Sequence, residues 1–547
     1  MPKSLAPSFS DFLFLAIVAW LFLFGEDSWS RLLLDGDTGW HIRTGEWILA
    51  HGQVPSHDLF SFSKNGEPWF AWEWGADIIY AKLHQWWGLK GIVVLAAAQI
   101  GLFATLIARL TLWSGANTLI TIAATMLAVG ASSLHYLARP HLFTLMLLPI
   151  CLWIIEADRR KPSRRVWALV PITIAWTNLH GGFLALIAFA GLLVAGTFGE
   201  ALWSRWRGEP ADWDQPRRYA IVLVLCGLAT FVNPYGYHLH SHIAAYLNSD
   251  WIRTVVQEFQ SPSFRAENLL QYEMLLLAGL LAAASQLARR RLVGPLWILF
   301  WAHQSLGSVR HVTVFVTVAA PIVAMEATWL WRRAVEGASK KSVQGILDSL
   351  ATDMGRNFRW TSPLPVLFVA GLLLVDALPI RWPRDFPALL FPVKLIEKHE
   401  ERIRTARVLT TDQWGDYLIY RFYPSHRVFI DGRSDFYGPV LGKQYVRVSS
   451  GQHDWREILD EHGFDLAMIP VEWSLGSLLK QHPDWRLIED DGKCLMFERR
   501  MDGPGEAKPS TVARTEGKFP AVVGSGEPGP APADQHFARA LKKRLPR

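Results

Sequence analysis

The sequence predicts a mainly helical membrane protein with a small α/β domain at its C-terminal end. Half of the 547 residues are hydrophobic and only 19% are charged, a balance typical of polytopic membrane proteins that carry a soluble portion. The 27 tryptophans are the second observation, because many lie near the ends of apolar runs, where interfacial aromatic belts form. Short apolar runs in the last third of the chain indicate strands.

Apolar runs long enough to cross a bilayer recur through the first 380 residues. A spanning helix needs roughly 20 apolar residues, and shorter ones are tolerated inside a bundle. About eleven segments qualify: 8–25, 91–113, 116–135, 141–157, 166–178, 182–200, 219–233, 272–288, 292–306, 310–331 and 363–380. Glu26 and Asp27 stand where a signal peptide would have its small-residue cleavage site, so we expect the first helix to be retained.

Basic residues indicate the orientation of these helices. Four alternate loops hold the clusters Arg159–Arg165, Arg205–Arg218, Arg289–Arg291 and Arg332–Lys341, whereas the other loops are poor in Lys and Arg. The positive-inside rule therefore places the N-terminus in the cytoplasm and the first long loop outside. With an odd number of spans, residues from 381 onward also lie outside. We expect a multi-pass protein of a bacterial cytoplasmic (inner) membrane.

Three regions follow from this pattern. Residues 1–380 form the membrane part, with a first external loop at 26–90; residues 381–500 form an extracytoplasmic α/β domain; and residues 501–547, rich in Gly, Pro and Ala, are expected to be disordered. In the α/β domain, strands are predicted at Val408–Thr411, Val428–Ile430, Leu466–Ile469 and Cys494–Phe497. Helices are predicted near 413–422 and 454–462.

Several classes of function do not fit the composition. The net charge is +6, but the basic residues sit in short loops between apolar segments, so topology explains them and no nucleic-acid partner is expected. No Gly-rich phosphate loop follows a strand, which disfavours nucleotide binding. The three cysteines do not have metal-ligand or disulfide spacing. His238, His240 and His242 alternate as in a metal-binding tract, but no acidic or Cys partner has a fixed spacing to them.

The uncommon polar residues near membrane depth gather on the predicted external side. They are Asp35, Asp37, His41, Glu73, Arg139, His141, Asn178, His180, Asn233, Glu258, Arg310 and His311. Such groups are costly to desolvate, so they usually have a partner or a role. One-sided clustering is expected if several helix ends line a shared cavity at the outer face.

The acidic members of this set also have structural interpretations. Asp37 is a favoured N-cap type and could cap a helix running from Thr38 to about Ala50. Asp35 could be a solvated loop residue, and His41, one turn after Asp37, could pair with it. Glu73, between two tryptophans, could bond to backbone amides at the interface.

The basic and glycine-flanked members are equally ambiguous. Arg139 and Arg310 could extend to lipid headgroups or clamp a phosphate, because a guanidinium offers bidentate donors. His180, beside two glycines, could be a helix-cap histidine. Asn233 to Gly236 reads as a tight turn that closes a helix. Asp431 to Asp435 reads as a tight turn, or as a segment that borders the membrane cavity and selects an acceptor.

The run from Asp37 to Gly88 resembles the first external loop of GT-C glycosyltransferases. The motifs that carry the resemblance are Asp37, Gly45-Glu46-Trp47, Val54-Pro55, Gly66-Glu67-Pro68-Trp69 and Ala71-Trp72-Glu73-Trp74. The nearest types are the protein O-mannosyltransferases and the lipid A aminoarabinose transferases, and the wider pattern resembles a largely uncharacterised group of bacterial membrane proteins. The chain departs from the family in two places: Thr38 follows Asp37 where a second acid is usual, and Trp72-Glu73-Trp74 replaces a Lys-Pro-Pro.

The resemblance implies an integral-membrane transferase that moves a sugar from a polyprenyl-phosphate donor to a glycan, lipid or protein acceptor at the outer face. Asp37 matches the catalytic acid and would be the general base, with Asp35, His41 or Glu73 orienting the acceptor. Arg139 and Arg310 would bind the phosphate, and the remaining substrate-binding candidates are His141, His180, His311 and Glu258. A divalent cation, Mg²⁺ or Mn²⁺, could be held by Asp35 and Asp37, although hard cations usually need more oxygen ligands.

Two other classes stay open. A transporter or flippase of lipid-linked saccharides would have polar residues on both sides of the membrane and pseudo-repeated halves, and neither is evident. A non-catalytic envelope-glycan assembly protein with a transferase-like cavity is the second alternative, because Thr38 occupies the place of the second acid. Convergence of Asp37, Arg139 and Arg310 on one outer cavity would favour the enzyme.

Overall fold

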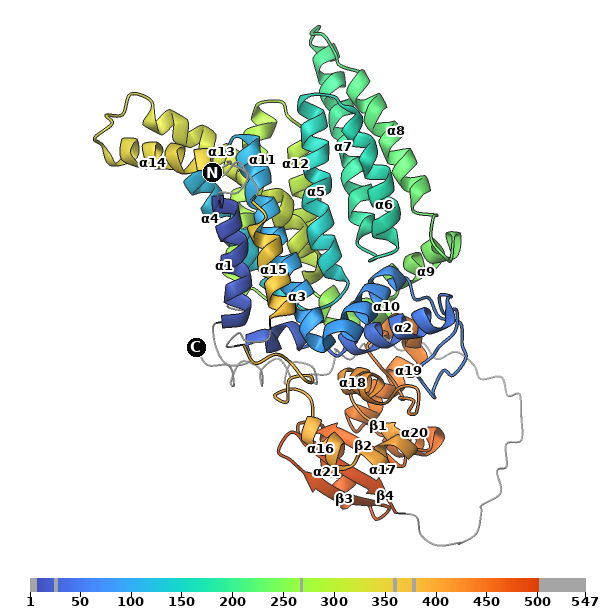
Figure 1. Cartoon of the computed structure of the whole chain (residues 1–547). Coiled ribbons are helices and arrows are strands. Elements are labelled where there is room, and N and C mark those ends of the chain that lie inside the picture. The colour runs from blue at the N-terminus through green and yellow to red at the C-terminus, as the bar shows by residue number, and fades with distance from the viewer. Residues whose placement is uncertain (1–6, 24–27, 266–268, 358–361, 376–379, 501–547) are drawn as a thin grey trace.

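The computed structural model describes residues 7–23, 28–265, 269–357, 362–375 and 380–500. A helical bundle stands on a layer of short helices, and a small mixed α/β part lies on the other side of that layer (Figure 1). The fold class predicted from the sequence is confirmed. The tail predicted to be disordered, 501–547, lies outside the described residues.

Each predicted span contains a helix. The bundle helices are α1 (Phe9–Leu23), α3 (Trp74–Ser114), α4 (Thr118–Ser132), α5 (His141–Arg160), α6 (Leu169–Thr177), α7 (Phe183–Trp206), α8 (Asp214–Ala229), α11 (Leu270–Ala288), α12 (Val293–Gly307), α13 (Val312–Val335) and α15 (Leu364–Leu374). Among the described residues, six helices, counted with the short turns that adjoin them, are long and apolar enough to cross a membrane: Trp74–Ser114, Thr118–His135, His141–Arg160, Phe183–Trp206, Leu270–Ala288 and Val309–Val335. The number of crossings therefore stays a prediction.

The basic loops gather at one end of the bundle. Arg218 of one loop region binds Asp158, which precedes another loop, at 2.8 Å, and Arg290 lies 3.4 Å from Glu209. A cavity of about 440 Å³ at this end is lined by arginines of three of the loop regions: Arg159, Arg160, Arg289, Arg291 and Arg332. The segregation of basic residues predicted from the sequence is therefore present in the fold.

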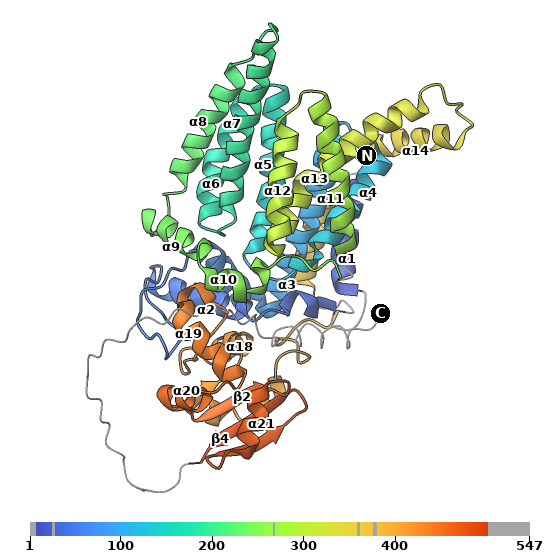
Figure 2. The same ribbon diagram turned by 180° about the vertical axis from the view of Figure 1, so that it is seen from behind.

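A layer of short helices covers the opposite end. It contains η2 (Ser28–Leu33), α2 (Asp37–His51), α9 (Tyr237–Leu247), α10 (Asp250–Val255) and η5 (Gln257–Phe259), and it separates the bundle from the sheet in both views (Figures 1 and 2). The helix α2 is the one predicted after Asp37. It ends at Gly52, whose positive φ of 68° suits glycine at a helix C-terminus.

The C-terminal part holds a four-stranded sheet and six helices. The strands β1 (Val408–Leu409), β2 (Leu466–Pro470), β3 (Trp485–Asp490) and β4 (Cys494–Arg499) lie in the order β1-β2-β4-β3. The first pair is parallel and the other two are antiparallel. The helices are α16 (Val393–Lys398), α17 (Glu400–Thr405), α18 (Asp412–Phe422), α19 (Ser434–Ser449), α20 (Trp455–His462) and α21 (Ser474–Gln481).

One predicted strand is wrong and one strand was missed. Val428–Ile430 is buried, but it pairs with the first external loop instead of the sheet: Val428 N–H donates to the Phe60 carbonyl and Phe62 N–H to the Val428 carbonyl, each at 2.9 Å. A short apolar run therefore reflects burial here and not a place in the sheet. The strand β3 lacks this signal, because only Trp485 of its side chains is fully buried.

Candidate active site

A cavity of about 2090 Å³ lies where the bundle, the layer of short helices and the C-terminal part meet. It takes in all the predicted site residues except His41: Asp35, Asp37, Glu73, Arg139, His141, His180, Glu258, Arg310 and His311. Much of the remaining wall is aromatic, including Trp40, Trp69, Trp72, Phe259 and Trp301. Ligand sites commonly combine such an apolar wall with a few convergent polar groups.

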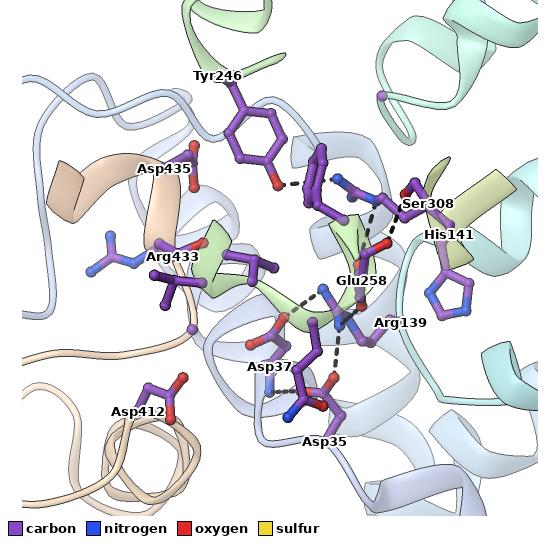
Figure 3. A pocket seen from close by; sticks show the side chains of 18 of the residues that line it. Asp35, Asp37, Arg139, His141, Tyr246, Glu258, Ser308, Asp412, Arg433 and Asp435 are labelled. Atoms are coloured by element: carbon purple, nitrogen blue, oxygen red, sulfur yellow. Dashed lines mark hydrogen bonds and ion pairs between the residues drawn. The ribbon is translucent and has the colours of Figure 1, made fainter. Parts of the chain in front are cut away.

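Arg139 is the centre of the charged network (Figure 3). Its Nη1 lies 2.7 Å from Asp35 Oδ2 and 3.0 Å from Glu258 Oε1, and its Nη2 lies 2.7 Å from Asp37 Oδ2. Its position just before Pro140 at the start of α5 places it at the end of the bundle that faces the cavity. The interpretation as a residue that reaches lipid headgroups is wrong, because three carboxylates hold the guanidinium inside the protein.

Arg310 joins this network through Glu258. Its Nε lies 3.4 Å from Glu258 Oε2, its Nη1 donates to the Tyr246 hydroxyl at 3.1 Å, and its guanidinium carbon lies 4.7 Å from the centre of the Phe259 ring. Burial disfavours the charge of Glu258, but Arg139 and Arg310 outweigh burial and hold its pKa well below the usual range. Asp37, Arg139 and Arg310 therefore converge on one cavity.

Asp37 does not cap its helix. The N-cap is Gly36 and Asp37 is the first helical residue, while the Asp35 carboxylate accepts the Asp37 N–H at 3.0 Å. One Asp37 oxygen binds Arg139. The other, Oδ1, is buried with no donor among the described side chains and backbone. The capping interpretation is thus wrong for Asp37, and the backbone contact that it predicted belongs to Asp35.

The second acid of the site comes from the C-terminal part. Asp416, on α18, is fully buried, and its carboxyl lies beside that of Asp37. Gly432 packs against both groups: a Cβ on it would lie 1.9 Å from Asp37 Oδ1 and 3.0 Å from Asp416 Oδ2. Its N–H donates to Asp416 Oδ1 at 2.9 Å. Thr38, at the position where the GT-C pattern has an acid, donates instead to the Ala138 carbonyl at 2.9 Å.

A shared proton accounts for the close approach of the Asp37 and Asp416 carboxyls. Burial raises the pKa of Asp37 to about 7 against the opposing effect of Arg139. Burial and the neighbouring Asp37 charge raise the pKa of Asp416 well above its usual range. Asp416 Oδ2, like Asp37 Oδ1, has no donor among the described residues, so a proton held by Asp416 satisfies both oxygens. Two acids that share one proton are expected when both are buried.

Glu73 lies between two histidines. Its two oxygens are 3.5 Å from His41 Nε2 and from His180 Nε2. Burial raises the pKa of Glu73 to about 8, although Arg139 and Arg310 oppose the rise. Burial also lowers the pKa of both histidines, so at neutral pH this group is an uncharged acid between two uncharged imidazoles.

Hydrogen bonds to neighbouring groups fix the rings of the four candidate-site histidines, His41, His141, His180 and His311. The predicted pairing of His41 with Asp37 is wrong: His41 is fully buried, and its Nδ1 contacts Asp77 Oδ1 at 2.6 Å. Asp77, on α3, was missed by the sequence analysis. Gly182 N–H donates to His180 Nδ1 at 2.9 Å. His141 Nε2 donates to the His135 carbonyl at 2.6 Å, and His311 Nδ1 to the Gln304 carbonyl at 3.3 Å.

The segment Asp431 to Asp435 does more than turn the chain. Arg433 is buried and binds Asp431 at 2.7 Å and Asp58 of the first external loop at 2.8 Å. Its guanidinium carbon lies 4.5 Å from the Trp69 ring centre and 5.0 Å from that of Phe60. This network ties the first loop to the C-terminal part beside Asp37 and Asp416. The segment also lines the cavity, and its selection of an acceptor stays a prediction.

The His238 tract does not converge on one point. His242 Nε2 lies 2.9 Å from Asp435 Oδ2, His240 Nε2 lies 2.7 Å from Thr230 Oγ1, and the His238 ring lies against Tyr237. The neighbouring Asn233 forms the predicted turn, and its Oδ1 accepts the Tyr235 N–H at 2.8 Å.

A divalent cation was predicted on Asp35 and Asp37. Within the part of the chain that the structure describes, no three His, Cys, Asp or Glu residues are grouped to hold a metal. The predicted ligand oxygens Asp35 Oδ2 and Asp37 Oδ2 both contact Arg139, so this arrangement of side chains does not fit the ion at that place. The cation stays a prediction.

Comparison with known proteins identifies the fold. No protein-family model and no curated protein matches the sequence. Among solved structures, the chain is similar to the apo oligosaccharyltransferase of Archaeoglobus fulgidus, with a TM-score of 0.53, 12% identity, and coverage of 86% of this chain and 70% of that one. The chain is also similar to archaeal AglB from the same organism, in complex with an inhibitory peptide and a dolichol-phosphate. The TM-score is 0.50 and the identity 12%, with coverage of 91% of this chain and 74% of that one.

A further similar structure is ArnT from Cupriavidus metallidurans bound to undecaprenyl phosphate, with a TM-score of 0.44, 14% identity, and coverage of 91% of this chain and 99% of that one. The likeness to the archaeal enzyme shows a GT-C fold, as the sequence resemblance implied. The subfamily stays a prediction.

Proposed function

We propose that the protein is a membrane glycosyltransferase that takes a sugar from a polyprenyl-phosphate donor and transfers it to an acceptor bound in the cavity. The observation that supports this most is the junction of Asp37, Arg139 and Arg310, which puts a carboxylate base and two cations in one partly apolar cavity. A fold by itself hosts many functions, so the proposal rests on this junction.

The cations suit a lipid phosphate. Arg139 already contacts three carboxylates, whereas Arg310 contacts Glu258 as its single carboxylate among the described residues. Arg310 is therefore the better phosphate ligand of the two predicted, and Arg139 keeps Asp37 and Asp35 in place. The aromatic wall would contact the isoprenoid chain. The similar AglB structure contains a dolichol-phosphate, which is a ligand of this chemical class.

The proposed reaction is a displacement at the anomeric carbon. The acceptor hydroxyl loses its proton to Asp37 as its oxygen bonds to the anomeric carbon, and the bond from that carbon to the phosphate oxygen breaks. The lipid phosphate leaves with the electron pair, and Arg310 stabilises its charge. A pKa of about 7 for Asp37 suits a general base that works near neutral pH.

The other predicted residues have supporting roles in this proposal. Glu73, uncharged at neutral pH, would hydrogen-bond a substrate hydroxyl, and His180 and His41 set its position. His141 and His311 shape the cavity wall, and Glu258 bridges the two arginines. The cavity would open at the extracytoplasmic face of a bacterial inner membrane, because the basic loops lie at the opposite end of the bundle.

A strain that lacks the gene tests this proposal. Its lipid extract should accumulate a polyprenyl-phosphate sugar and its envelope should lack one glycan, and the wild-type gene should restore both. The gene with Asp37→Asn should not restore them, whereas the control Glu67→Gln, in the exposed part of the first loop, should. Accumulation of the lipid-linked sugar on the cytoplasmic leaflet alone would indicate the flippase. Full restoration by Asp37→Asn would indicate the non-catalytic assembly protein.

A further inference from the structure

The helix α14 (Val343–Asn357) presents an apolar face that no described part of the chain covers. It projects sideways from the bundle at the end opposite to the sheet in both views (Figures 1 and 2). Val343 is 70% exposed, Ile346 56% and Leu350 47%. The stretch lies among the basic loop residues, and the sequence analysis missed the helix.

The surface of α14 is divided into three sides. Val343, Ile346, Leu347 and Leu350 have the spacing of one helix face. At about 100° of rotation per residue, Ala351 lies roughly a quarter of a turn, and Asp348 roughly two-fifths of a turn, from the middle of that face. This second side meets the bundle: Ala351 is 3% exposed, and Trp331 Nε1 donates to Asp348 Oδ1 at 3.0 Å. The exposed residues Ser349 and Thr352 occupy a third, polar side.

This division is what a helix at a membrane surface requires. One side packs on the spanning helices, the polar side meets water, and the apolar side is left for the boundary between headgroups and acyl chains. A helix surrounded by water would not keep such a face exposed at low cost.

Basic residues flank the helix. Lys340 and Lys341 lie just before Ser342 and the start of α14 and are exposed, and Arg332 and Arg333 lie in the last turn of α13. Clusters of Lys and Arg next to a spanning helix attract anionic lipids, with about 1 kcal/mol per residue near the surface. The apolar face and the charges thus point to the same occupant.

We propose that α14 lies in the interface of the bilayer, with its apolar face Val343, Ile346, Leu347 and Leu350 among the acyl chains and Lys340 and Lys341 on anionic headgroups. The site is distinct from the cavity, and the inference does not depend on glycosyl transfer. It gives the fourth basic loop a physical role, because the lysines of that loop anchor a helix to the leaflet.

Fluorescence quenching of the full-length protein in vesicles of zwitterionic and anionic phospholipid tests the proposal. Cys151, Cys226 and Cys494 are buried, so a polarity-sensitive label can be attached to Ile346→Cys on the apolar face and to Ser349→Cys as the matched control. Lipid-borne nitroxide should quench the label at 346 several-fold more than at 349, and a water-soluble quencher should give the reverse order. Leu350→Cys provides a second apolar position if Ile346→Cys does not fold.

Two results would overturn the proposal. Equal quenching at the two positions would show that α14 stands in water. Protection of position 346 from both quenchers, increasing with the protein-to-lipid ratio, would show that a second copy covers the face. The lysines have their own control: in Lys340→Gln with Lys341→Gln, lipid quenching at position 346 should no longer rise with the anionic lipid fraction. An unchanged rise would contradict the role of the lysines.

Discussion

The carboxyls of Asp37 and Asp416 meet across the boundary between the membrane part and the C-terminal part, with Gly432 packed against both. The acid that the GT-C pattern places next to Asp37 is Thr38 here. A second acid nevertheless lies beside the Asp37 carboxylate: it is Asp416, which α18 supplies. The C-terminal part is therefore a component of the candidate site.

Asp416 should set the pH at which Asp37 works. Asp416→Asn keeps a donor toward Asp37 Oδ1 and should preserve most activity. Asp416→Leu removes that donor. The loss of a hydrogen bond to a charged group, about 1.5–3 kcal/mol, should raise the pKa of Asp37 and move the acid limb of the pH–rate profile up by roughly one to two pH units. Profiles of the two variants that coincide would contradict the hydrogen bond between the acids.

Arg139 should also set the position of the acid limb of the pH–rate profile. The general base is active when ionised, so wild-type activity should appear as the pH rises through about 7. The charge of Arg139 lowers the pKa of Asp37, so Arg139→Met should move the limb to higher pH as well as reduce the maximal rate. Arg139→Lys, which keeps the charge, should restore the position of the limb in part. An unmoved limb in Arg139→Met would separate Arg139 from Asp37.

Glu73 should function as a neutral acid. Because burial raises its pKa to about 8, the carboxyl is mostly protonated at pH 7, and Gln reproduces its shape and supplies an N–H donor in place of its O–H. Glu73→Gln should therefore retain activity at pH 7, whereas Glu73→Ala should lose most of it. A loss in Glu73→Gln as large as in Glu73→Ala would show that the ionised form is needed.

Arg433 should hold the first loop on the C-terminal part. Removing one partner of a buried ion pair costs about 3–5 kcal/mol, because the other charge stays buried. Arg433→Met leaves Asp58 and Asp431 without their cation and should lower the midpoint of thermal unfolding in detergent. Arg427→Met is the matched control: Arg427 also contacts the first loop, at Asn65, but it is exposed, so this change should alter the midpoint little. Similar midpoints for both variants would refute the structural role.

Local patterns predicted the elements that depend on neighbours along the chain. The spans follow from long apolar runs, and α2 is predicted from Asp37 as a favoured N-cap type, although Gly36 takes the cap position. The helix α14 has a helical periodicity, but its apolar face meets no protein, and the surrounding lysines and arginines make the stretch read as a loop.

Contacts between distant segments could not be read in this way. The predicted topology groups Asp37, Arg139 and Glu258, but it does not predict a place for Asp416 in the site, because a carboxylate on an amphipathic helix of a soluble domain usually faces water. His41 likewise meets Asp77 of α3, since Arg139 already occupies the carboxylate one turn away. The strand prediction for Val428–Ile430 was wrong because Val428 is buried by the first loop, a distant segment, and the local sequence does not indicate such a contact.

The most direct test of glycosyl transfer is the release of lipid phosphate by the purified full-length protein. The protein would be reconstituted with the lipid-linked sugar that accumulates in the deletion strain, together with an acceptor fraction from its envelope. Wild type should release free polyprenyl phosphate as the sugar moves to the acceptor. Asp37→Asn should release it roughly a hundredfold or more slowly, as expected when a general base is lost. Release by Asp37→Asn at the wild-type rate, or no transfer by the wild type, would contradict the account.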